Sequence, residues 1–598
     1  ISAKDARDNP VPSVEGIIQG RAAGVNITQS SGIPGQAQSI RIRGTTSITA
    51  TNEPLYVVDG VPMVSESNSQ LFTGGYNSNS MADLNPADIE TISVLKDAAA
   101  TAIYGSRGAN GVILITTKRG KAGKSKINFN YYSGVQQPTR VIEMLDSRQF
   151  IEMLDEAAAN DGFVEGYWSG NGPGFNFIGD PNDPELQNTD WLDEIYQNGN
   201  ISNYDLSAAG GNETVQYYVG GSYLQNEGYF RGSSFDRISG RVNLDVLATD
   251  KLKFGTNMLL SRTRQNRPIG DNSLFGGPIN ALAGDPTMPV FEDDGSYADP
   301  FVYWSWWAFE NPRAATDIYQ RQSFTNRVLA TVFADYEFFP GLTFRSSWSI
   351  DYKTLNDKSF IPSNAAQSFR NDIGGQGFFG TNEDFTYNIE NYLTYTKDFG
   401  DHSLTATAIY SLQESNSQFS SINGQTYALD ALPNLALASE ITAGSQNGTS
   451  WGIRSLTGRI NYGYKGKYFF DFTTRYDGSS RFGSQTRNGT FPAASVAWRA
   501  IEEPFLQDVS FLSDLKLRAS YGVTGNQEGI NNFASRALWT TQAAYNNQGS
   551  ALPNRLGNGD LQWERTASLD IGIDIGLFAD RVTISADYYN KQTNELLL

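Results

Sequence analysis

The stretch LDIGIDIGLFADRVTISADYY, residues 569–589, alternates apolar and polar side chains along both of its halves. Every second residue from Leu569 to Leu577 is leucine or isoleucine, and the residues between them are aspartate or glycine. The same alternation continues from Val582 to Tyr588. A period of two is typical of β-strands that have one apolar and one polar face. The stretch therefore predicts two such strands.

The same pattern recurs, for example at 343–352 and 468–477, and predicts roughly fifteen strands between Ile127 and Lys591. These strands are about 10–14 residues long, whereas the strands of a soluble β-sandwich, the alternative fold, are usually about 5–6. Tyrosine and tryptophan near the strand ends are typical of the aromatic girdles of outer-membrane barrels. The sequence therefore favours a membrane β-barrel.

Short and long connections alternate between the predicted strands, as in outer-membrane barrels. The short turns are Pro340–Gly341, Gly400–Asp401 and Lys465–Gly466. The long, polar connections lie near 264–322, 415–448, 478–489 and 524–561, and a helical insertion is predicted at 147–161.

Composition excludes several classes of function. The chain of 598 residues carries a net charge of −19, which is a poor basis for binding nucleic acid. It has no cysteine and one histidine, His402, so we predict no metal site, no cofactor and no catalytic triad. We find no constellation of nucleophile, base and orienting group, and therefore predict that the protein is not an enzyme.

The first 120 residues differ from the rest, because they combine short segments of mixed character. Val57–Val58 and Ile113–Ile115 are predicted to be buried strands, and a helix is predicted to begin after Asn85, with Pro86 in its first turn. These features predict a small α+β domain at 1–120, followed by the barrel at 121–598.

Long motifs in a fixed order resemble the SusC/RagA-like, or starch-utilisation, type of TonB-dependent outer-membrane receptor. The motifs include VEGIIQGRAAGVNITQSSGIPG (14–35), DIETISVLKDAAATAIYGSRGANGVILITTKRGK (88–121), GKYFFDFTTRYDGSSRFG (466–483) and LQWERTASLDIGIDIGLFADRVTISADYYNKQTNELLL (561–598).

This resemblance implies an antiparallel membrane barrel of about 22 strands, with the N-terminal α+β domain as a plug inside its lumen. It implies import of large nutrients, either oligosaccharides or peptides, across the outer membrane of a Gram-negative bacterium. The TonB complex would drive import through a TonB box missing before Ile1, and a SusD-like surface lipoprotein would close as a lid. We also expect the last strands to be missing after Leu598. The alternative is a structural or adaptor barrel with little or no transport.

The resemblance also implies a lock between plug and barrel, formed by Arg43 of the IRIRG segment and Glu564 of the LQWE segment. Arg41 lies two residues before Arg43, so it is predicted to share the same strand face and carboxylate. Lys96 stands where many relatives have arginine, which makes Arg107 the next candidate for a second plug cation. The alternative is that Arg43 bonds only plug carbonyls and Glu564 caps an outer loop.

Aromatic side chains in two predicted loops are candidates for ligand contact, because flat rings give large contact area at low entropic cost. They could instead anchor their loops, lie in the interface belt or face the lid lipoprotein. Replacing the three tryptophans by alanine is expected to weaken uptake. The candidates are Trp304, Trp306 and Trp307, and secondarily Tyr167, Trp168, Phe175 and Phe177.

Overall fold

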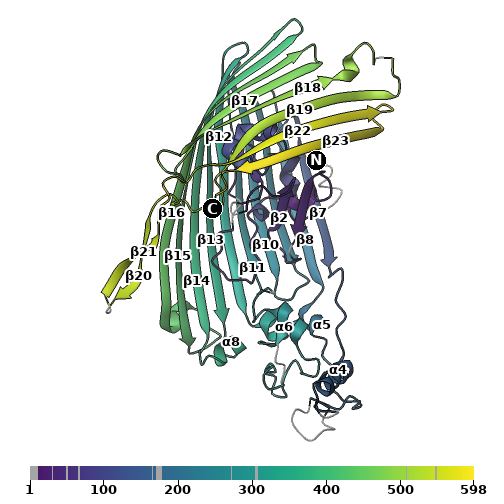
Figure 1. Cartoon of the computed structure of the whole chain (residues 1–598), viewed down its shortest axis with the longest axis vertical. Helices are drawn as coiled ribbons and strands as arrows, with labels where there is room; N and C mark the ends of the chain where they lie inside the picture. Colours follow the sequence, from purple (N-terminus) through teal and green to yellow (C-terminus); the bar gives the residue numbers. More distant parts are fainter. Residues whose placement is uncertain are drawn as a thin grey trace.

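The structure, a computed structural model, is dominated by one large antiparallel sheet (Figure 1). It describes residues 11–29, 31–48, 51–64, 67–163, 166–169, 178–270, 272–303, 308–506, 508–545 and 548–597. No helix among these residues is long and apolar enough to cross a membrane.

The sheet has fifteen strands, and each pairs with the next along the chain, except that β19 pairs with β22. Strands β7 and β23 form its two edges, so the sheet does not close within the described residues. The strands are β7 (Gly123–Gln136), β8 (Gly199–Gly211), β9 (Val215–Glu227), β10 (Ser234–Thr249), β11 (Leu252–Asn266), β12 (Gln320–Phe339), β13 (Leu342–Ile361), β14 (Gln376–Phe399), β15 (His402–Tyr427), β16 (Ala438–Tyr464), β17 (Tyr468–Ser479), β18 (Asn488–Arg499), β19 (Leu512–Asn526), β22 (Glu564–Leu577) and β23 (Val582–Asn594).

The faces of the sheet are inverted relative to a soluble protein. On β22, Ile571 is 50 % exposed, whereas its neighbour Asp570 is 3 % exposed. Apolar side chains point outwards, where lipid would solvate them, and polar side chains point inwards. This inversion excludes the soluble sandwich and confirms the barrel wall predicted from the alternation.

The three short turns lie where the sequence predicts them, but one long connection is wrong. The predicted loop at 415–448 is largely strand, because β15 continues to Tyr427 and β16 begins at Ala438. Residues 415–427 and 438–448 are mostly polar on both faces, so the alternation fades before the strands end. The connection at 524–561 also contains a separate hairpin of β20 (Leu538–Tyr545) and β21 (Gln548–Arg555).

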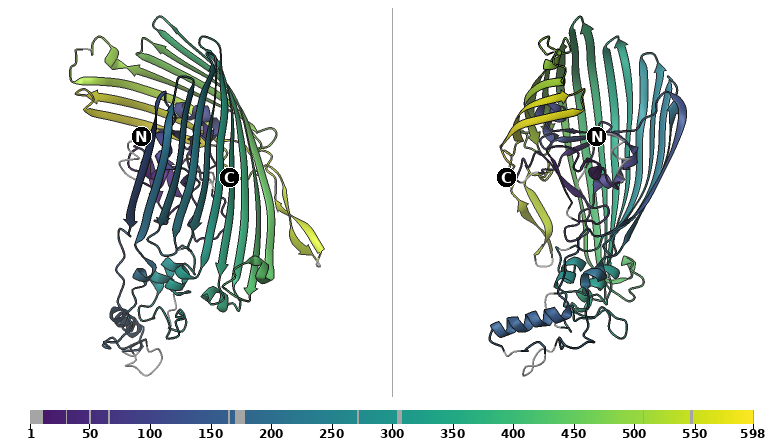
Figure 2. Two further views of the ribbon diagram at one scale, coloured as in Figure 1. Left: turned by 180° about the vertical axis from the view of Figure 1, so that it is seen from behind. Right: turned by 90° about the vertical axis from the view of Figure 1, so that its right-hand side faces the viewer.

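The N-terminal domain lies on the concave side of the sheet (Figure 2). Its core packs Ile17, Ile40 and Ile113 together, and Leu259 and Leu329 of the barrel wall join the same cluster. It contains a β1–β2 pair and a sheet in the order β4-β3-β6-β5. The elements are α2 (Val14–Ile18), β1 (Val25–Gln29), β2 (Gln38–Ile42), β3 (Leu55–Val58), β4 (Val61–Pro62), η1 (Ser80–Asp83), η2 (Pro86–Asp88), β5 (Ile89–Leu95), α3 (Ala98–Thr101), η3 (Ala102–Arg107) and β6 (Val112–Thr117).

The helix predicted after Asn85 is wrong beyond its first turn. The Asn85 side chain caps the short helix η2, but the chain then enters strand β5. The segment IETISVL is rich in β-branched residues, and it pairs with β6 in the plug sheet. The strands expected at Val57–Val58 and Ile113–Ile115 are confirmed.

The long connections gather at one end of the sheet, at the lower end of Figure 1, and carry short helices. The insertion predicted at 147–161 is confirmed as α4 (Ser147–Asn160), which begins with a capping box at Asp146. The other helices here are α5 (Trp191–Ile195), α6 (Gly277–Ala283), α7 (Pro312–Asp317) and α8 (Ala366–Phe369), and η4 (Leu435–Leu437) lies between β15 and β16. We call this end the outer end.

Candidate functional site

Buried ion pairs join the plug to the inner wall of the sheet; we call this contact surface the plug–barrel seam. Arg241 of β10 pairs with Asp59 of the plug, and both side chains are less than 5 % exposed. Arg327 of β12 lies 3.4 Å from Asp83 of the plug and 2.6 Å from Asp351 of its own wall. Burying such charges requires a counter-charge or several hydrogen-bond partners, since an uncompensated buried charge costs several kcal/mol.

Arg43 also lies at the seam, but its predicted partner is wrong. Its guanidinium pairs with Asp570 of β22 and with Asp97 of the plug, at 2.7 Å from the latter. Glu564 instead accepts hydrogen bonds from Ser47 of the plug, at 2.8 Å, and from Asn526. The two carboxylates are six residues apart on one strand face, or roughly 20 Å, so one arginine cannot reach both.

The other predicted cations also have different partners. Strand β2 ends at Ile42 and Arg43 has a positive φ of 58°, which breaks the alternation that would have placed Arg41 beside it. Arg41 therefore pairs with Glu53 inside the plug. Arg107 does reach the barrel, where it donates to the side-chain amide of Gln413 rather than to a carboxylate.

Residues 67–76 of the plug form hydrogen bonds with the outer half of the wall. Asp357 of β13 accepts hydrogen bonds from the Ser69 hydroxyl, at 2.9 Å, and from the Gln70 amide, at 2.7 Å. Arg267, just after β11, donates to Ser69 and to the Tyr76 carbonyl. Polar contacts thus recur at the seam beside the apolar contacts of Leu259 and Leu329, and water can replace the polar ones if the plug shifts.

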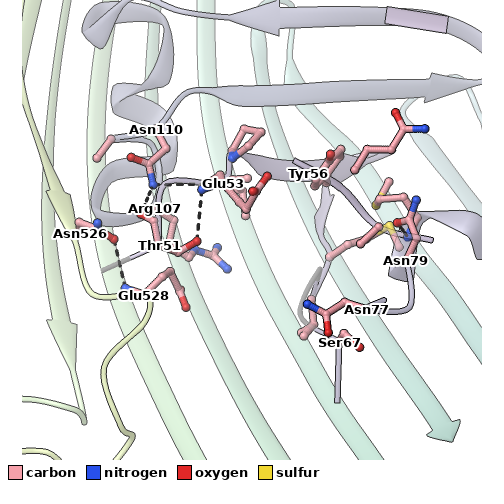
Figure 3. Close-up of a pocket in the computed structure, with 18 of the residues that line it drawn as sticks. Thr51, Glu53, Tyr56, Ser67, Asn77, Asn79, Arg107, Asn110, Asn526 and Glu528 are labelled. Atoms are coloured by element: carbon pink, nitrogen blue, oxygen red, sulfur yellow. Dashed lines mark hydrogen bonds between the residues drawn. The ribbon is translucent and has the colours of Figure 1, made fainter. Parts of the chain in front are cut away.

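A cavity of about 300 Å³ lies between the plug and the wall (Figure 3). Its barrel side is formed by residues within β15 and β16 and by residues at or just after the ends of β17 and β19. Figure 3 shows Arg107, Asn110 and Glu528 on one side of it, and Tyr56 and Asn79 on the other. Its lining residues include Glu15, Gln38, Glu53, Tyr56, Asn79, Arg107, Trp451 and Arg481.

The aromatic candidates from the sequence lie elsewhere or outside the described residues. Trp304, Trp306, Trp307, Phe175 and Phe177 fall in segments that the structure does not describe. Tyr167 and Trp168 are half-buried beside α4, and their rings contact edge to face with centroids 5.1 Å apart. Neither lines the central cavity, so a ligand role for either remains a prediction.

Sequence reasoning missed the acidic partners Asp59, Asp83 and Asp570 and the cavity residue Arg481. A signal was present, because Asp570 and Arg327 occupy polar positions of clearly alternating strands, which face the lumen. A charged residue at such a position must find a counter-charge there. The pattern could therefore have indicated seam residues, although not their partners.

Glu310 joins two outer connections. Its carboxylate accepts hydrogen bonds from the Tyr319 hydroxyl, at 2.7 Å, and from the Ala366 amide, at 2.8 Å. The latter amide begins α8, whose own N-cap residue, Ala365, provides no side-chain cap. Arg370, also from the α8 connection, donates to the Phe309 carbonyl and pairs with Asp299. Burial raises the pKa of Glu310 from 4.5 to about 7.

We expect the contact between these two connections to weaken as the pH rises from 5 to 8. Because the folded pKa of Glu310 is raised, its stabilising contribution is complete below about pH 4.5 and is lost as the pH passes 7. A shift of this size corresponds to roughly 3 kcal/mol of local stability. Hydrogen-exchange protection factors of residues 366–370, corrected for intrinsic rates, measure it. Burial and the neighbouring Glu310 raise the pKa of Tyr319 far above this range, so Glu310→Gln should abolish the pH dependence; an unchanged dependence would contradict the assignment.

Family models match both parts of the chain. A model described as TonB-dependent Receptor Plug Domain matches residues 1–112, and one described as TonB dependent receptor-like, beta-barrel matches residues 254–598. A TonB-dependent receptor of Formosa agariphila is 36% identical over 100% of this chain and 58% of its own length. The TonB-dependent receptor SusC of Bacteroides thetaiotaomicron is 32% identical over 98% of this chain and 58% of its own. The chain thus spans little more than half the length of these relatives.

A solved structure shares the arrangement of plug and sheet. The RagAB peptide transporter superposes with a TM-score of 0.85 and 27% sequence identity, covering 100% of this chain and 67% of that chain. The siderophore receptor PirA from Acinetobacter baumannii, at 14% identity and a TM-score of 0.56, shares the fold alone.

Proposed function

Since the chain belongs to the TonB-dependent receptors, outer-membrane proteins of Gram-negative bacteria, we propose that it imports large nutrients across that membrane. The nutrients are oligosaccharides or peptides too large for passive pores. The observation that carries this proposal is the polar seam, which holds a folded plug against the wall through exchangeable hydrogen bonds and ion pairs.

The proposal includes two partners. The TonB complex supplies the force that displaces the plug. A SusD-like surface lipoprotein covers the outer end. Exposed apolar side chains before and on α4 support a covering partner there, because apolar groups at a polar outer surface favour protein contact. These side chains are Val141, Ile142, Met144, Leu145 and Met153.

Energy-dependent uptake tests this function. Cells that carry the full-length receptor gene should take up labelled malto-oligosaccharides or mixed peptides, and cells without the gene should not. We expect removal of TonB, or collapse of the proton gradient, to reduce uptake by at least about tenfold while surface binding persists, because binding and release are separate steps. Uptake of a small solute through unrelated porins is the control.

The outcomes separate import from the adaptor role. Uptake that does not respond to loss of TonB would mean that the barrel is a passive pore. Absence of uptake and of surface binding, with the receptor present in the membrane, would contradict import and favour a structural role.

A further inference from the structure

A groove of about 500 Å³ crosses the outward face of the sheet over β16, β17, β18, β19 and β22. These strands are neighbours in the sheet, and the last four lie in the upper half of Figure 1. The floor of the groove has small side chains, Val496 of β18 and Ala519 of β19, which are paired across the two strands. Phe470 of β17 and Ile571 of β22 lie on either side of them in the same cross-strand row. The two small residues therefore leave a trough between two bulkier ones.

The groove is apolar and lies among side chains that face the membrane. Phe470 is 43 % exposed and Ile571 is 50 % exposed, as expected of residues that lipid contacts. Arg518 also borders the groove, but its guanidinium lies on the inner face, 3.7 Å from Asp97 of the plug. Other residues that line the groove are Tyr462, Tyr468, Trp498 and Leu517.

Van der Waals contact is what favours filling this groove, because lipid tails are as apolar as the wall itself. A hydrocarbon chain in the groove contacts the floor and both sides. A chain on a flat part of the wall contacts the protein on one side only. The groove therefore favours one bound chain over freely exchanging lipid.

One end of the groove is polar and lies at the short turns, opposite the outer end. Tyr468 begins β17 directly after the turn Lys465–Gly466, and Trp498 lies just before the short helix η5 (Ala500–Glu502). The Tyr468 hydroxyl and the Trp498 Nε1 atom both donate to Glu503, at 2.7 and 3.2 Å. Aromatic rings with an apolar body and a hydrogen-bonded tip are typical of the boundary between membrane and water. The groove therefore runs from the periplasmic boundary into the hydrocarbon region.

Two lysines and two carboxylates lie at this boundary. Lys467 is 3.5 Å from Glu503. Lys465 is 3.7 Å from Asp401 and lies over the ring of Tyr464, which in turn stacks on the first tyrosine of β17. An ammonium group has three donors and a carboxylate has about four acceptor sites, so each can bind a further group and keep its present partner. A head group that carries one phosphate and one ammonium matches this balanced set of charges.

We propose that the groove is a binding site for one zwitterionic phospholipid. An acyl chain lies over Val496 and Ala519, and the phosphate lies at Lys465 and Lys467. The ammonium of an ethanolamine head group then lies at Glu503. Phospholipids of this class fill the periplasmic leaflet of the outer membrane, which is the leaflet that the short turns reach. The inference goes beyond import, because it requires only that the barrel lies in its membrane.

Native mass spectrometry of the full-length receptor tests the site through ligand chemistry, without altering the protein. The receptor is delipidated in detergent and mixed with phosphatidylethanolamine, with phosphatidylglycerol, or with glycerophosphoethanolamine, which is the head group without chains. We expect one retained phosphatidylethanolamine per receptor. Retention of phosphatidylglycerol should be about tenfold lower, since it lacks the ammonium that pairs with a carboxylate. Glycerophosphoethanolamine should not be retained, since it lacks the chain.

Two results of this comparison would overturn the proposal. Several adducts of both lipids in equal amounts would mean that lipid contacts the wall without a site. Retention of the chain-free head group as strongly as the lipid would mean that the lysines bind phosphate and that the groove has no part in it.

Filling the groove tests the position of the chain. Ala519→Phe should lower the retained fraction of phosphatidylethanolamine by about tenfold, because the ring occupies the floor of the groove. The matched control is Ala330→Phe on β12. Ala330 faces outward between Met258 and Ile350 in its cross-strand row and does not line the groove, so retention should not change. Equal retention by the two variants would contradict the position of the chain.

A second variant tests the position of the head group. Glu503→Gln removes the negative charge and keeps an oxygen acceptor for Tyr468 and Trp498, so the preference for phosphatidylethanolamine over phosphatidylglycerol should fall by about tenfold. Asp250→Asn, at an exposed position in the short turn after β10, is the control and should preserve it. An unchanged preference in Glu503→Gln would contradict the position of the ammonium.

The same spectra distinguish a lipid from a second copy of the chain. A wild-type receptor that retains no lipid and has the mass of two copies, with Ala519→Phe at the mass of one, would show that the groove is an interface between copies. That result would overturn the lipid assignment.

Discussion

Replacing Arg327 with glutamine is expected to destabilise the docked plug by about 3–5 kcal/mol, because it leaves buried carboxylates without a counter-charge. The guanidinium is 1% exposed and lies between Asp351 of the wall and Asp83 of the plug, each 4% exposed. It also donates to the Ser80 carbonyl at 2.9 Å. Lys353 also lies near Asp83 but pairs with Asp384 at 3.4 Å, so loss of Arg327 removes the cation that Asp83 and Asp351 share at the seam.

The urea concentration at which a protease begins to cleave the plug measures this loss. Arg565→Gln is the matched control, because its pair with Glu595 is about half-exposed and should contribute less than about 1 kcal/mol. Adding Asp83→Asn and Asp351→Asn to Arg327→Gln should recover part of the loss, since the repelling charges are then removed. A midpoint for Arg327→Gln equal to that of Arg565→Gln would contradict the role of this arginine.

The strands of the barrel wall could be predicted from the sequence because the alternation of apolar and polar side chains is a local pattern. A strand between lipid and a polar lumen must alternate, and the segment from Leu569 to Leu577 does so without interruption. The rule fails where the environment changes. The outer parts of β15 and β16 are mostly polar on both faces, so their side chains carry no clear alternation to recognise.

The seam could be predicted only in part, because its pairs join residues far apart in the chain. Arg43 lies at the seam, but its partner Asp570 depends on where the plug lies along β22. That position is set by the packing of the whole plug against the wall. The cavity was also beyond sequence reasoning, since Glu15 and Arg481 are separated by most of the chain and appear unremarkable in isolation.

Tethering the plug to the wall is expected to abolish uptake if import requires the plug to move. The chain has no cysteine, so introduced pairs react without background. Ser47 and Glu564 bond across the seam at 2.8 Å, and cysteines at both positions can be joined by a short, cleavable thiol-reactive linker. Ser31 and Gln36, which bond to each other within the plug and do not line the cavity, provide the matched control pair.

The most direct measurement is therefore nutrient uptake by cells that carry the Ser47→Cys, Glu564→Cys receptor. The nutrient is one that the receptor binds, and uptake is measured before linking, after linking and after cleavage of the linker. We predict that linking lowers uptake by at least about tenfold while surface binding stays, that cleavage restores it, and that linking the control pair has no effect. Undiminished uptake through a fully linked plug and wall would contradict import by plug displacement.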